Sequence, residues 1–161
     1  MTNDALNQLN DFFVHVFNKI LAWEEQALST VGDRNLSVKE LHVLEAVAGL
    51  TAQENNTMTC IADRLSIRVS SLTAAVNTLV RKGYLRRESA PEDRRIIRVF
   101  LTERGEEADR LHTQFHNRMM QGATEQLSEA ELAVLLLSLS SLDRFFTDMA
   151  KQNSDQPEKG I

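Results

Sequence analysis

Cysteine, proline and long hydrophobic runs are scarce in this chain of 161 residues, and their scarcity excludes several classes of protein. The single cysteine, Cys60, cannot form an intrachain disulfide, which excludes a small secreted domain held together by disulfides. The longest apolar run, Leu132 to Leu137, is far shorter than the roughly 20 residues that a membrane-spanning helix needs. The first ten residues lack the basic and apolar segments of a signal peptide. We therefore expect a soluble cytoplasmic protein of one domain or two small lobes, without a membrane partner.

Acidic and basic side chains are unevenly distributed along the chain. The whole sequence has 23 acidic and 18 basic residues and a net charge of −5. Residues 64–98 nevertheless hold nine basic and only three acidic residues. A basic segment in an acidic protein is typical of a surface that contacts phosphates, although arginines paired with acids on a solvated surface would give the same count. Charge alone leaves both interpretations open.

Apolar residues at spacings of three and four predict a mainly helical protein. The first 30 residues carry one such stripe, which includes Phe13, Val16 and Ile20. Ser-x-x-Glu capping boxes that start at Ser37 and Ser128 predict two further helix starts, and Thr102 predicts another. These signals indicate helices over about 37–49, 103–126 and 128–151.

The central region has the pattern of a winged helix-turn-helix. A helix over 57–65 and a second over 69–82 are separated by a short turn, and Gly83 ends the second helix. Two β-rich segments follow, with turn residues between them, and these predict a hairpin wing. The predicted fold is mainly α, with three helices and a wing flanked by long terminal helices. The predicted parts are a dimerisation helix (1–36), the winged lobe (37–102), dimerisation helices (103–151) and a disordered tail (152–161).

The residues predicted to bind double-stranded DNA lie on the second helix of this motif and on the hairpin. Small polar side chains let a helix enter the major groove, and an asparagine such as Asn77 can pair with adenine. Arginines at a hairpin tip suit the narrow minor groove. The candidate contacts are Arg68, Ser70, Ser71, Thr73, Ala74, Asn77, Arg81, Arg86, Arg87, Asp93, Arg94 and Arg95. Surface ion pairs are the plain alternative for the arginines.

The two terminal helices predict self-association. Each keeps an apolar repeat of seven residues, and neither belongs to the winged lobe. Such stripes are most simply buried against a second copy, although burial within one chain would also satisfy them. A homodimer would place two recognition helices about 34 Å apart, on successive major grooves of a pseudo-palindromic operator.

Several segments resemble MarR-type transcriptional regulators over nearly the whole chain. The helix-turn-helix segments are Ile61-Ala62-Asp63-Arg64-Leu65, Ser70-Ser71-Leu72-Thr73 and Leu79 to Arg87, and the wing segments are Asp93-Arg94-Arg95 and Leu101-Thr102-Glu103-Arg104-Gly105. The resemblance implies that Asp93 braces the wing, that Arg95 contacts DNA, and that the protein is a repressor. One departure is Arg68, because the family usually has serine or threonine at this helix cap.

A further likeness concerns the effector. Phe17 to Leu21, Glu24-Glu25, Lys39 to His42, Leu111-His112, Phe115-His116 and Met119-Met120 resemble the branch that represses fatty-acid synthesis genes. That branch uses an acyl chain on acyl carrier protein as co-repressor. The resemblance implies an apolar pocket, with packed core as the alternative for each residue. The candidate lining residues are Phe13, Phe17, Trp23, Phe115 and Met119.

The histidines suggest a second type of effector, Zn²⁺. His112 and His116 are four residues apart on one predicted helix, a spacing that can hold a metal, although a polar helix face has the same spacing. His42 and either Glu24 or Glu25 would complete the ligands, and zinc-responsive MarR-type regulators have a comparable set. No cofactor is otherwise indicated. No nucleotide-binding or nucleophile motif is present, so we expect no enzyme, and an adaptor that binds an acidic protein is the remaining alternative.

Overall fold

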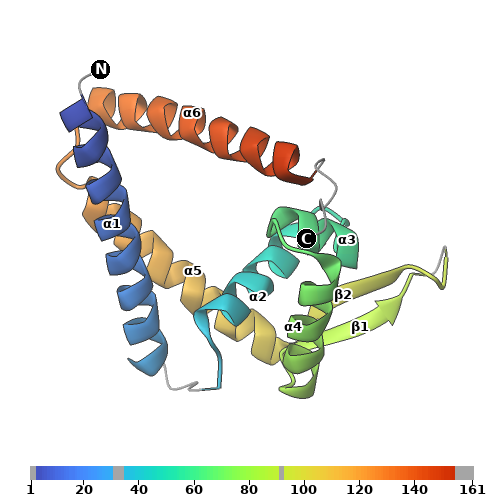
Figure 1. Cartoon of the computed structure of the whole chain (residues 1–161). Coiled ribbons are helices and arrows are strands. Elements are labelled where there is room, and N and C mark those ends of the chain that lie inside the picture. The colour runs from blue at the N-terminus through green and yellow to red at the C-terminus, as the bar shows by residue number, and fades with distance from the viewer. Residues whose placement is uncertain (1–2, 31–34, 91–92, 155–161) are drawn as a thin grey trace, which may run out of the picture. The chain divides into compact units, whose positions relative to one another are not determined.

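The computed structural model describes residues 3–30, 35–90 and 93–154. Its order of elements confirms the predicted winged helix-turn-helix with long terminal helices (Figure 1). The elements are α1 (Asn3–Thr30), α2 (Val38–Thr51), α3 (Met58–Arg64), α4 (Val69–Arg81), β1 (Leu85–Ser89), β2 (Ile97–Leu101), α5 (Glu103–Thr124) and α6 (Glu129–Ser154). Within the described residues, no helix combines the length and apolar content needed to cross a membrane.

The chain divides into two compact units, residues 1–116 and 117–161. The boundary differs from the predicted partition, because α1 and the first part of α5 belong to the same unit as the winged lobe. The predicted disordered tail begins too early, since residues 152–154 continue α6 as a helix. The rest of that predicted tail, 155–161, lies outside the described residues.

The core of the first unit lies between α2, α3, α4 and the hairpin. Its largest fully buried side chains include Leu44, Ile61, Leu72 and Val99. The helices begin where the sequence predicts. Glu40 N donates to Ser37 Oγ at 3.3 Å, and Ser37 N donates to Glu40 Oε2 at 2.8 Å, which completes the predicted capping box of α2.

The turn between α3 and α4 depends on a residue with left-handed backbone geometry. Ser66 has φ 53°, a conformation that costs energy for any residue other than glycine. Ser66 N donates to Asp63 O and Ile67 N donates to Ala62 O, each at 3.0 Å. The chain therefore reverses within a few residues, and α4 begins immediately after this turn.

The wing is an antiparallel hairpin whose register runs from Leu85 opposite Leu101 to Ser89 opposite Ile97. Buried Asn56 attaches it to the helices. The Asn56 Nδ2 group donates to Val99 O at 2.7 Å, and Val99 N donates to Asn56 O at 3.0 Å. These two bonds fix the position of β2 relative to the start of α3.

The junction between the wing and α5 is held by Thr102. Thr102 Oγ1 donates to Gly83 O at 2.7 Å and accepts from Gly105 N at 3.2 Å. Gly83 itself has φ 80°, in the left-handed region that suits a glycine after a helix. The predicted cap of α5 is thus confirmed, and it also ties the end of α4 to the start of α5.

The second unit contains the end of α5 and all of α6. Glu131 N donates to Ser128 Oγ at 3.3 Å, and Ser128 N donates to Glu131 Oε2 at 2.9 Å, which confirms the predicted capping box. Large apolar side chains of α6 are exposed in the single chain, among them Leu137 and Phe146.

Candidate nucleic-acid interface and effector sites

The polar face of α4 is exposed, as a recognition helix requires. Leu72, Val76 and Leu79 are fully buried, and they hold the helix against the core. The exposed candidate contacts on this helix are Ser70, Ser71, Ala74, Asn77 and Arg81. Thr73 is only half-exposed, and its hydroxyl donates to Val69 O at 2.8 Å within the helix.

Arg68 occupies the N-cap position of α4, as predicted. Its backbone is extended, with φ −70° and ψ 143°, and its side chain makes no capping hydrogen bond. The first N–H groups of a helix lack intrahelical partners and carry partial positive charge. An exposed guanidinium beside those N–H groups is suited to an anion such as a DNA phosphate.

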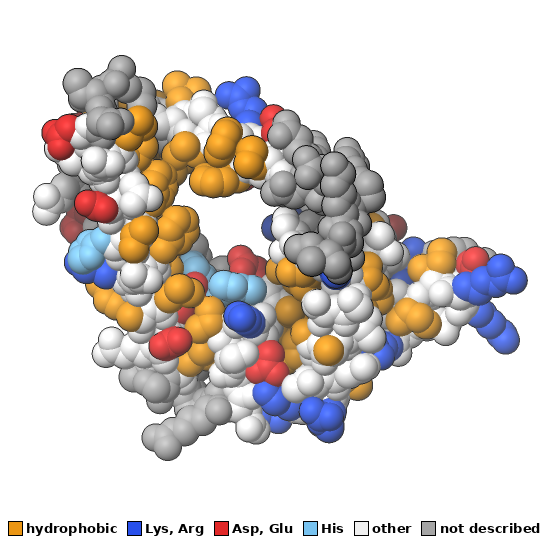
Figure 2. Space-filling view, viewed as in Figure 1, with side chains coloured by type: hydrophobic (Ala, Val, Ile, Leu, Met, Phe, Trp, Pro, Cys, Tyr) orange, Lys and Arg blue, Asp and Glu red, His pale blue; other side chains and the backbone are white. Residues whose placement is uncertain are grey.

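The tip of the hairpin has a braced turn with two exposed arginines. Asp93 Oδ1 accepts a hydrogen bond from Arg95 N at 2.9 Å, and Asp93 O accepts one from Ile96 N at 2.9 Å. Asp93 therefore braces the wing by an Asx turn, the role that the family resemblance implies. Arg94 and Arg95 are exposed, and Figure 2 shows basic side chains near the end of the hairpin.

The other arginines of the hairpin differ in their surroundings. Arg86 forms an ion pair with Glu88, and its guanidinium carbon lies 4.7 Å from the Phe100 ring centre. Arg87 is exposed beside it. Arg98 is half-buried, and its Nη1 donates to Glu54 O at 2.9 Å.

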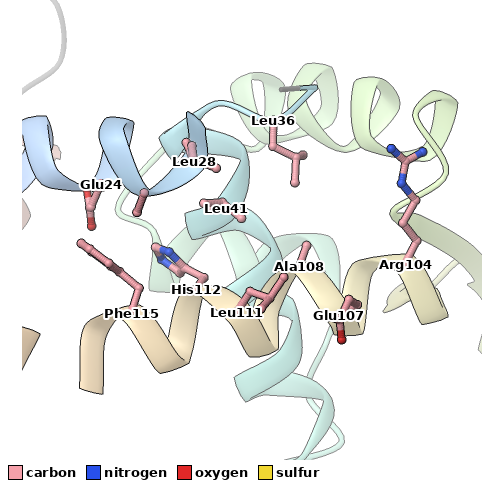
Figure 3. Close-up of a pocket in the computed structure, with 11 residues that line it drawn as sticks. Glu24, Leu28, Leu36, Leu41, Arg104, Glu107, Ala108, Leu111, His112 and Phe115 are labelled. Carbon is pink, nitrogen blue, oxygen red and sulfur yellow. The ribbon is translucent and has the colours of Figure 1, made fainter. Parts of the chain in front are cut away.

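An apolar cavity of about 440 Å³ lies within the first unit, between α1, the segment 36–41 and α5. Its size falls in the range of sites for small molecules. Figure 3 shows Glu24, His112 and Phe115 at one end of the cavity and Arg104 at the other. The apolar walls are Ala27, Leu28, Leu36, Leu41, Ala108 and Leu111.

Only one of the predicted pocket residues lines this cavity. Phe115 does so, whereas Phe17 and Trp23 are 60% and 56% exposed in the single chain. Phe13 stacks on Phe17 at a ring distance of 6.1 Å, and Met119 belongs to the second unit. The aromatic pattern predicted an apolar stripe on α1, but the cavity wall is formed by smaller residues near the end of that helix. Leu28 and Leu41 were missed because they resemble ordinary core residues.

Glu24, His42, His112 and His116 converge on one point, and the structure selects Glu24 over Glu25 as the carboxylate. One ligand atom from each residue lies within 4.8 Å of all the others. Glu24 is 3% exposed and comes from α1, His42 comes from α2, and the other two histidines come from α5. Elements distant in the sequence thus bring together a carboxylate and three imidazoles.

Three separations among these atoms are close to those of a tetrahedral metal site. Zn²⁺ with bonds of about 2.0–2.1 Å needs ligand atoms about 3.3 Å apart. Glu24 Oε1 lies 3.2 Å from His116 Nε2 and 3.5 Å from His42 Nε2, and the Nε2 atoms of His112 and His116 are 3.1 Å apart. Burial lowers the pKa of His112, which favours the neutral imidazole that a metal requires.

The fold and the exposed basic hairpin define the class of protein: a winged helix-turn-helix regulator. Residues 34–96 match the model of the MarR family. This match covers most of the winged helix-turn-helix and agrees with the resemblance that the sequence motifs carry.

Three relatives illustrate the likeness. The Bacillus subtilis HTH-type transcriptional regulator YpoP is 29% identical over 129 residues, which cover 80% of this chain and 89% of YpoP. The structure of Streptococcus pneumoniae FabT in complex with DNA is 28% identical, with a TM-score of 0.77, and the match covers 89% of this chain and 99% of FabT. The S. aureus MepR–DNA complex is 21% identical with a TM-score of 0.71, covers 84% of this chain and 94% of MepR, and supports the fold.

Proposed function

We propose that this chain is a homodimeric, non-enzymatic repressor that binds a pseudo-palindromic operator in double-stranded DNA. The observation that carries the proposal is the exposed polar face of α4 together with the braced, arginine-bearing hairpin tip. α4 would read the major groove, and Arg94 and Arg95 would reach the minor groove. The likeness to FabT, whose solved structure contains DNA, supports the proposal.

The first experiment compares wild type with Arg95→Ala on a duplex selected from a random pool. Loss of a groove contact is expected to weaken binding by about 1–3 kcal/mol and to lower the salt slope by about one. Fluorescence anisotropy over a range of salt concentrations measures both quantities. Arg110→Ala is the matched control, because Arg110 is an exposed arginine of α5 that pairs with Glu107.

Unchanged affinity and salt slope in Arg95→Ala would exclude the wing contact. A wild-type protein that shows no salt-linked affinity even for random duplex at low salt would exclude DNA binding as a whole. That second outcome is the one expected of an adaptor that uses its basic surface on an acidic protein.

The proposed effector is an acyl chain carried on acyl carrier protein, with fatty-acid synthesis genes as targets. Two observations support it: the sequence resemblance to the branch that regulates these genes, and the apolar cavity of about 440 Å³. The acyl chain would occupy the space between Leu28, Leu41 and Leu111. Addition of acyl carrier protein that carries a long acyl chain is expected to raise operator affinity. The control is the same carrier protein without an acyl chain.

A metal-responsive regulator is the second candidate, and the spacing of the four ligand atoms favours it. Zn²⁺ would be held by Glu24, His42, His112 and His116, and its bonds to these residues would link α1, α2 and α5. His116→Gln is expected to lower zinc affinity at least about tenfold, since it removes one of four ligands. Competition with a chromophoric chelator measures this affinity, and His15→Gln is the control because His15 is an exposed histidine outside the cluster.

Equal zinc affinity in wild type and His116→Gln would contradict this site. Operator binding measured first with a chelator and then with added zinc shows whether the metal regulates the protein. The acyl and zinc proposals involve neighbouring space, because Glu24 and His112 line the cavity and also belong to the four-residue cluster.

A further inference from the structure

The wing is attached to the rest of the first unit through β2. The hairpin projects from the helices (Figure 1), and a two-stranded hairpin by itself is at most marginally stable in water. β1 is exposed from Arg86 to Ser89, whereas Val99 of β2 is fully buried. The direction in which the wing points therefore depends on the contacts that β2 makes with the helices.

Residues 54–57, which connect α2 to α3, lie along the second edge of β2. Thr57 and Arg98 pair as an antiparallel bridge, next to the two hydrogen bonds that Asn56 forms with β2. The Arg98 side chain adds a further attachment, because its Nη1 donates to Glu54 O at 2.9 Å. Thr57 is also the N-cap residue of α3, so one segment both supports the wing and begins the helix-turn-helix.

The carbonyl that Arg98 binds belongs to a residue with left-handed backbone geometry. Glu54 has φ 56°, a conformation that costs energy for a residue other than glycine and persists only where the surrounding structure holds it. Two hydrogen bonds hold it here: Glu54 N donates to Thr51 O at 3.0 Å, and Asn55 N donates to Leu50 O at 2.9 Å. The end of α2 thus fixes the acceptor to which the Arg98 guanidinium is bonded.

We propose that Arg98 is a positioning residue, which holds the wing at the angle that lets Arg95 reach DNA. The inference rests on the proposed function, because the wing contact belongs to that proposal. It adds a half-buried arginine that acts on operator affinity through Arg95 and not through a DNA contact of its own.

The length of the wing beyond Arg98 makes its tip sensitive to this attachment. Arg95 is three residues away, which corresponds to about 10 Å of extended chain. A tilt of about 20° over this length moves the tip by about 3 Å, which is enough to break a hydrogen bond to DNA. The Asx turn of Asp93 shapes the tip but does not aim it, since both partners of that bond lie within the tip.

A direct phosphate contact is the alternative role for Arg98, and salt dependence distinguishes the two roles. Each phosphate contact adds about one to the salt slope. If Arg98 bound a phosphate, its loss would lower the slope whether or not Arg95 was present. If Arg98 acts through Arg95, its loss lowers the slope only while Arg95 is in place.

The first experiment is a double-mutant cycle on the selected operator duplex, measured by anisotropy over a range of salt concentrations. Arg98→Met keeps an apolar stem and removes the donors, and it is expected to weaken binding about fivefold or more, as the loss of one groove contact does. It is also expected to lower the salt slope by about one. In the Arg95→Ala background, the same substitution is expected to weaken binding less than about twofold and to leave the slope unchanged.

Three comparisons separate positioning from a general loss of structure. A merely structural role would reduce the folded fraction, so Arg98→Met would then weaken binding equally with and without Arg95. In the Asn77→Ala background, Arg98→Met is expected to have its full effect within about twofold, because Asn77 lies on α4 and not on the wing. Arg110→Met, at an exposed arginine of α5, is expected to bind like wild type.

Hydrogen exchange tests the attachment of the wing without DNA. Val99 N donates to Asn56 O across the junction, so its exchange rate reports how often β2 separates from residues 54–57. Arg98→Met is expected to speed this exchange at least about tenfold, within the usual range for loss of a hydrogen bond from a charged donor. Leu72 N, which donates to Arg68 O at 3.1 Å in α4, is the control amide and is expected to keep its rate.

NMR of the arginine side chains in wild type keeps the inference testable if Arg98→Met does not fold. The Arg98 guanidinium is expected to rotate slowly in the free protein and in the DNA complex, because Glu54 O holds it in both. The Arg95 guanidinium is expected to slow only when DNA is added. An Arg98 guanidinium that also slowed only with DNA would be a DNA contact, and the inference would be wrong.

The outcomes separate this inference from the proposed function. An equal loss of affinity from Arg98→Met with and without Arg95 would overturn the inference and leave DNA binding intact. Exchange of the Val99 amide at the wild-type rate in Arg98→Met would also overturn it. Wild type that does not bind duplex DNA would refute the proposed function, while hydrogen exchange would still show whether Arg98 holds the wing.

Discussion

At the scale of single residues, Glu40 has two roles at once. Its side chain completes the capping box of α2, and its carboxylate accepts hydrogen bonds from Lys82 Nζ at 2.7 and 2.9 Å. Burial acts to raise the pKa of Glu40, but the bonds from Lys82 and Ser37 outweigh burial and lower the pKa below 4.5. The ionised form is therefore the one that the fold stabilises.

This shift gives stability a defined pH dependence. Because the pKa of Glu40 is lower in the folded state, its contribution is fully present above the unfolded value of 4.5 and is lost as the pH falls through the folded value. Glu40→Gln is expected to lower the free energy of unfolding by about 1 kcal/mol at neutral pH and by less in acid. Urea unfolding across pH measures this difference, and Glu125→Gln, at an exposed carboxylate of the second unit, is the control.

A difference between wild type and Glu40→Gln that is constant from pH 7 to pH 3 would contradict this assignment. It would mean that the side chain contributes through packing and the cap geometry alone. The lysine partner offers an independent check, because Lys82→Met should remove only the part of the pH-dependent stability that comes from Lys82, while Ser37 and Glu40 stay hydrogen-bonded to each other.

At the scale of elements, a substitution at the start of α4 is expected to have opposite effects on fold stability and on DNA binding. Arg68 is at the N-cap, yet it makes no capping hydrogen bond. Arg68→Ser is expected to stabilise the fold by about 0.5–1 kcal/mol, because serine can accept a bond from the first helical turn. The same change is expected to weaken DNA binding, since it removes an exposed cation next to the N–H groups that would meet a phosphate.

Thermal unfolding and anisotropy measure these two effects in one variant. Arg68→Ala serves as the control, because it removes the cation without supplying a cap. If Arg68→Ser bound DNA as tightly as wild type, Arg68 would have no role at the interface. If it were also no more stable, the geometry at this helix start would not accept a serine cap.

The elements that the sequence predicts best are those with local determinants. The capping boxes at Ser37 and Ser128 involve residues three apart, so they are visible in the sequence and present in the structure. The bond from Asn56 to Val99 joins residues 43 apart, and that from Lys82 to Glu40 joins residues 42 apart. Such contacts depend on how elements pack together, and no local pattern reveals them.

The candidate sites show the same distinction. The recognition helix and the hairpin tip are continuous in the sequence, and the structure exposes most of their predicted contacts. The histidine pair of α5 was visible from its spacing, but only the packing of α1 could decide between Glu24 and Glu25. Phe17 and Trp23 were expected to line the pocket because periodicity identifies an apolar stripe without identifying the surface that covers it.

At the scale of the whole molecule, the apolar side chains that remain exposed require an explanation. α1 exposes Phe12 and Phe17, and α6 exposes Leu137, Leu139 and Phe146. Soluble proteins rarely leave so many large apolar side chains in water without a partner. A second copy of the chain would cover these helices, and it would also supply the second recognition helix that a pseudo-palindromic operator needs.

Leu139→Glu tests this assembly, because Leu139 belongs to the seven-residue apolar repeat of α6 and is 45% exposed in the single chain. In a two-fold dimer the change occurs twice, and each copy both loses leucine burial and places a carboxylate in an apolar interface, so the dimer is expected to weaken by about 3 kcal/mol or more. Sedimentation velocity over a range of protein concentrations should show a dimer for wild type and a more than hundredfold weaker association for the variant.

Ser140→Glu, which adds the same charge one residue outside the repeat, is expected to remain dimeric. Operator affinity should fall with dimerisation in Leu139→Glu alone, since a monomer reaches only one half-site, and equal association in both variants would place the dimer interface elsewhere.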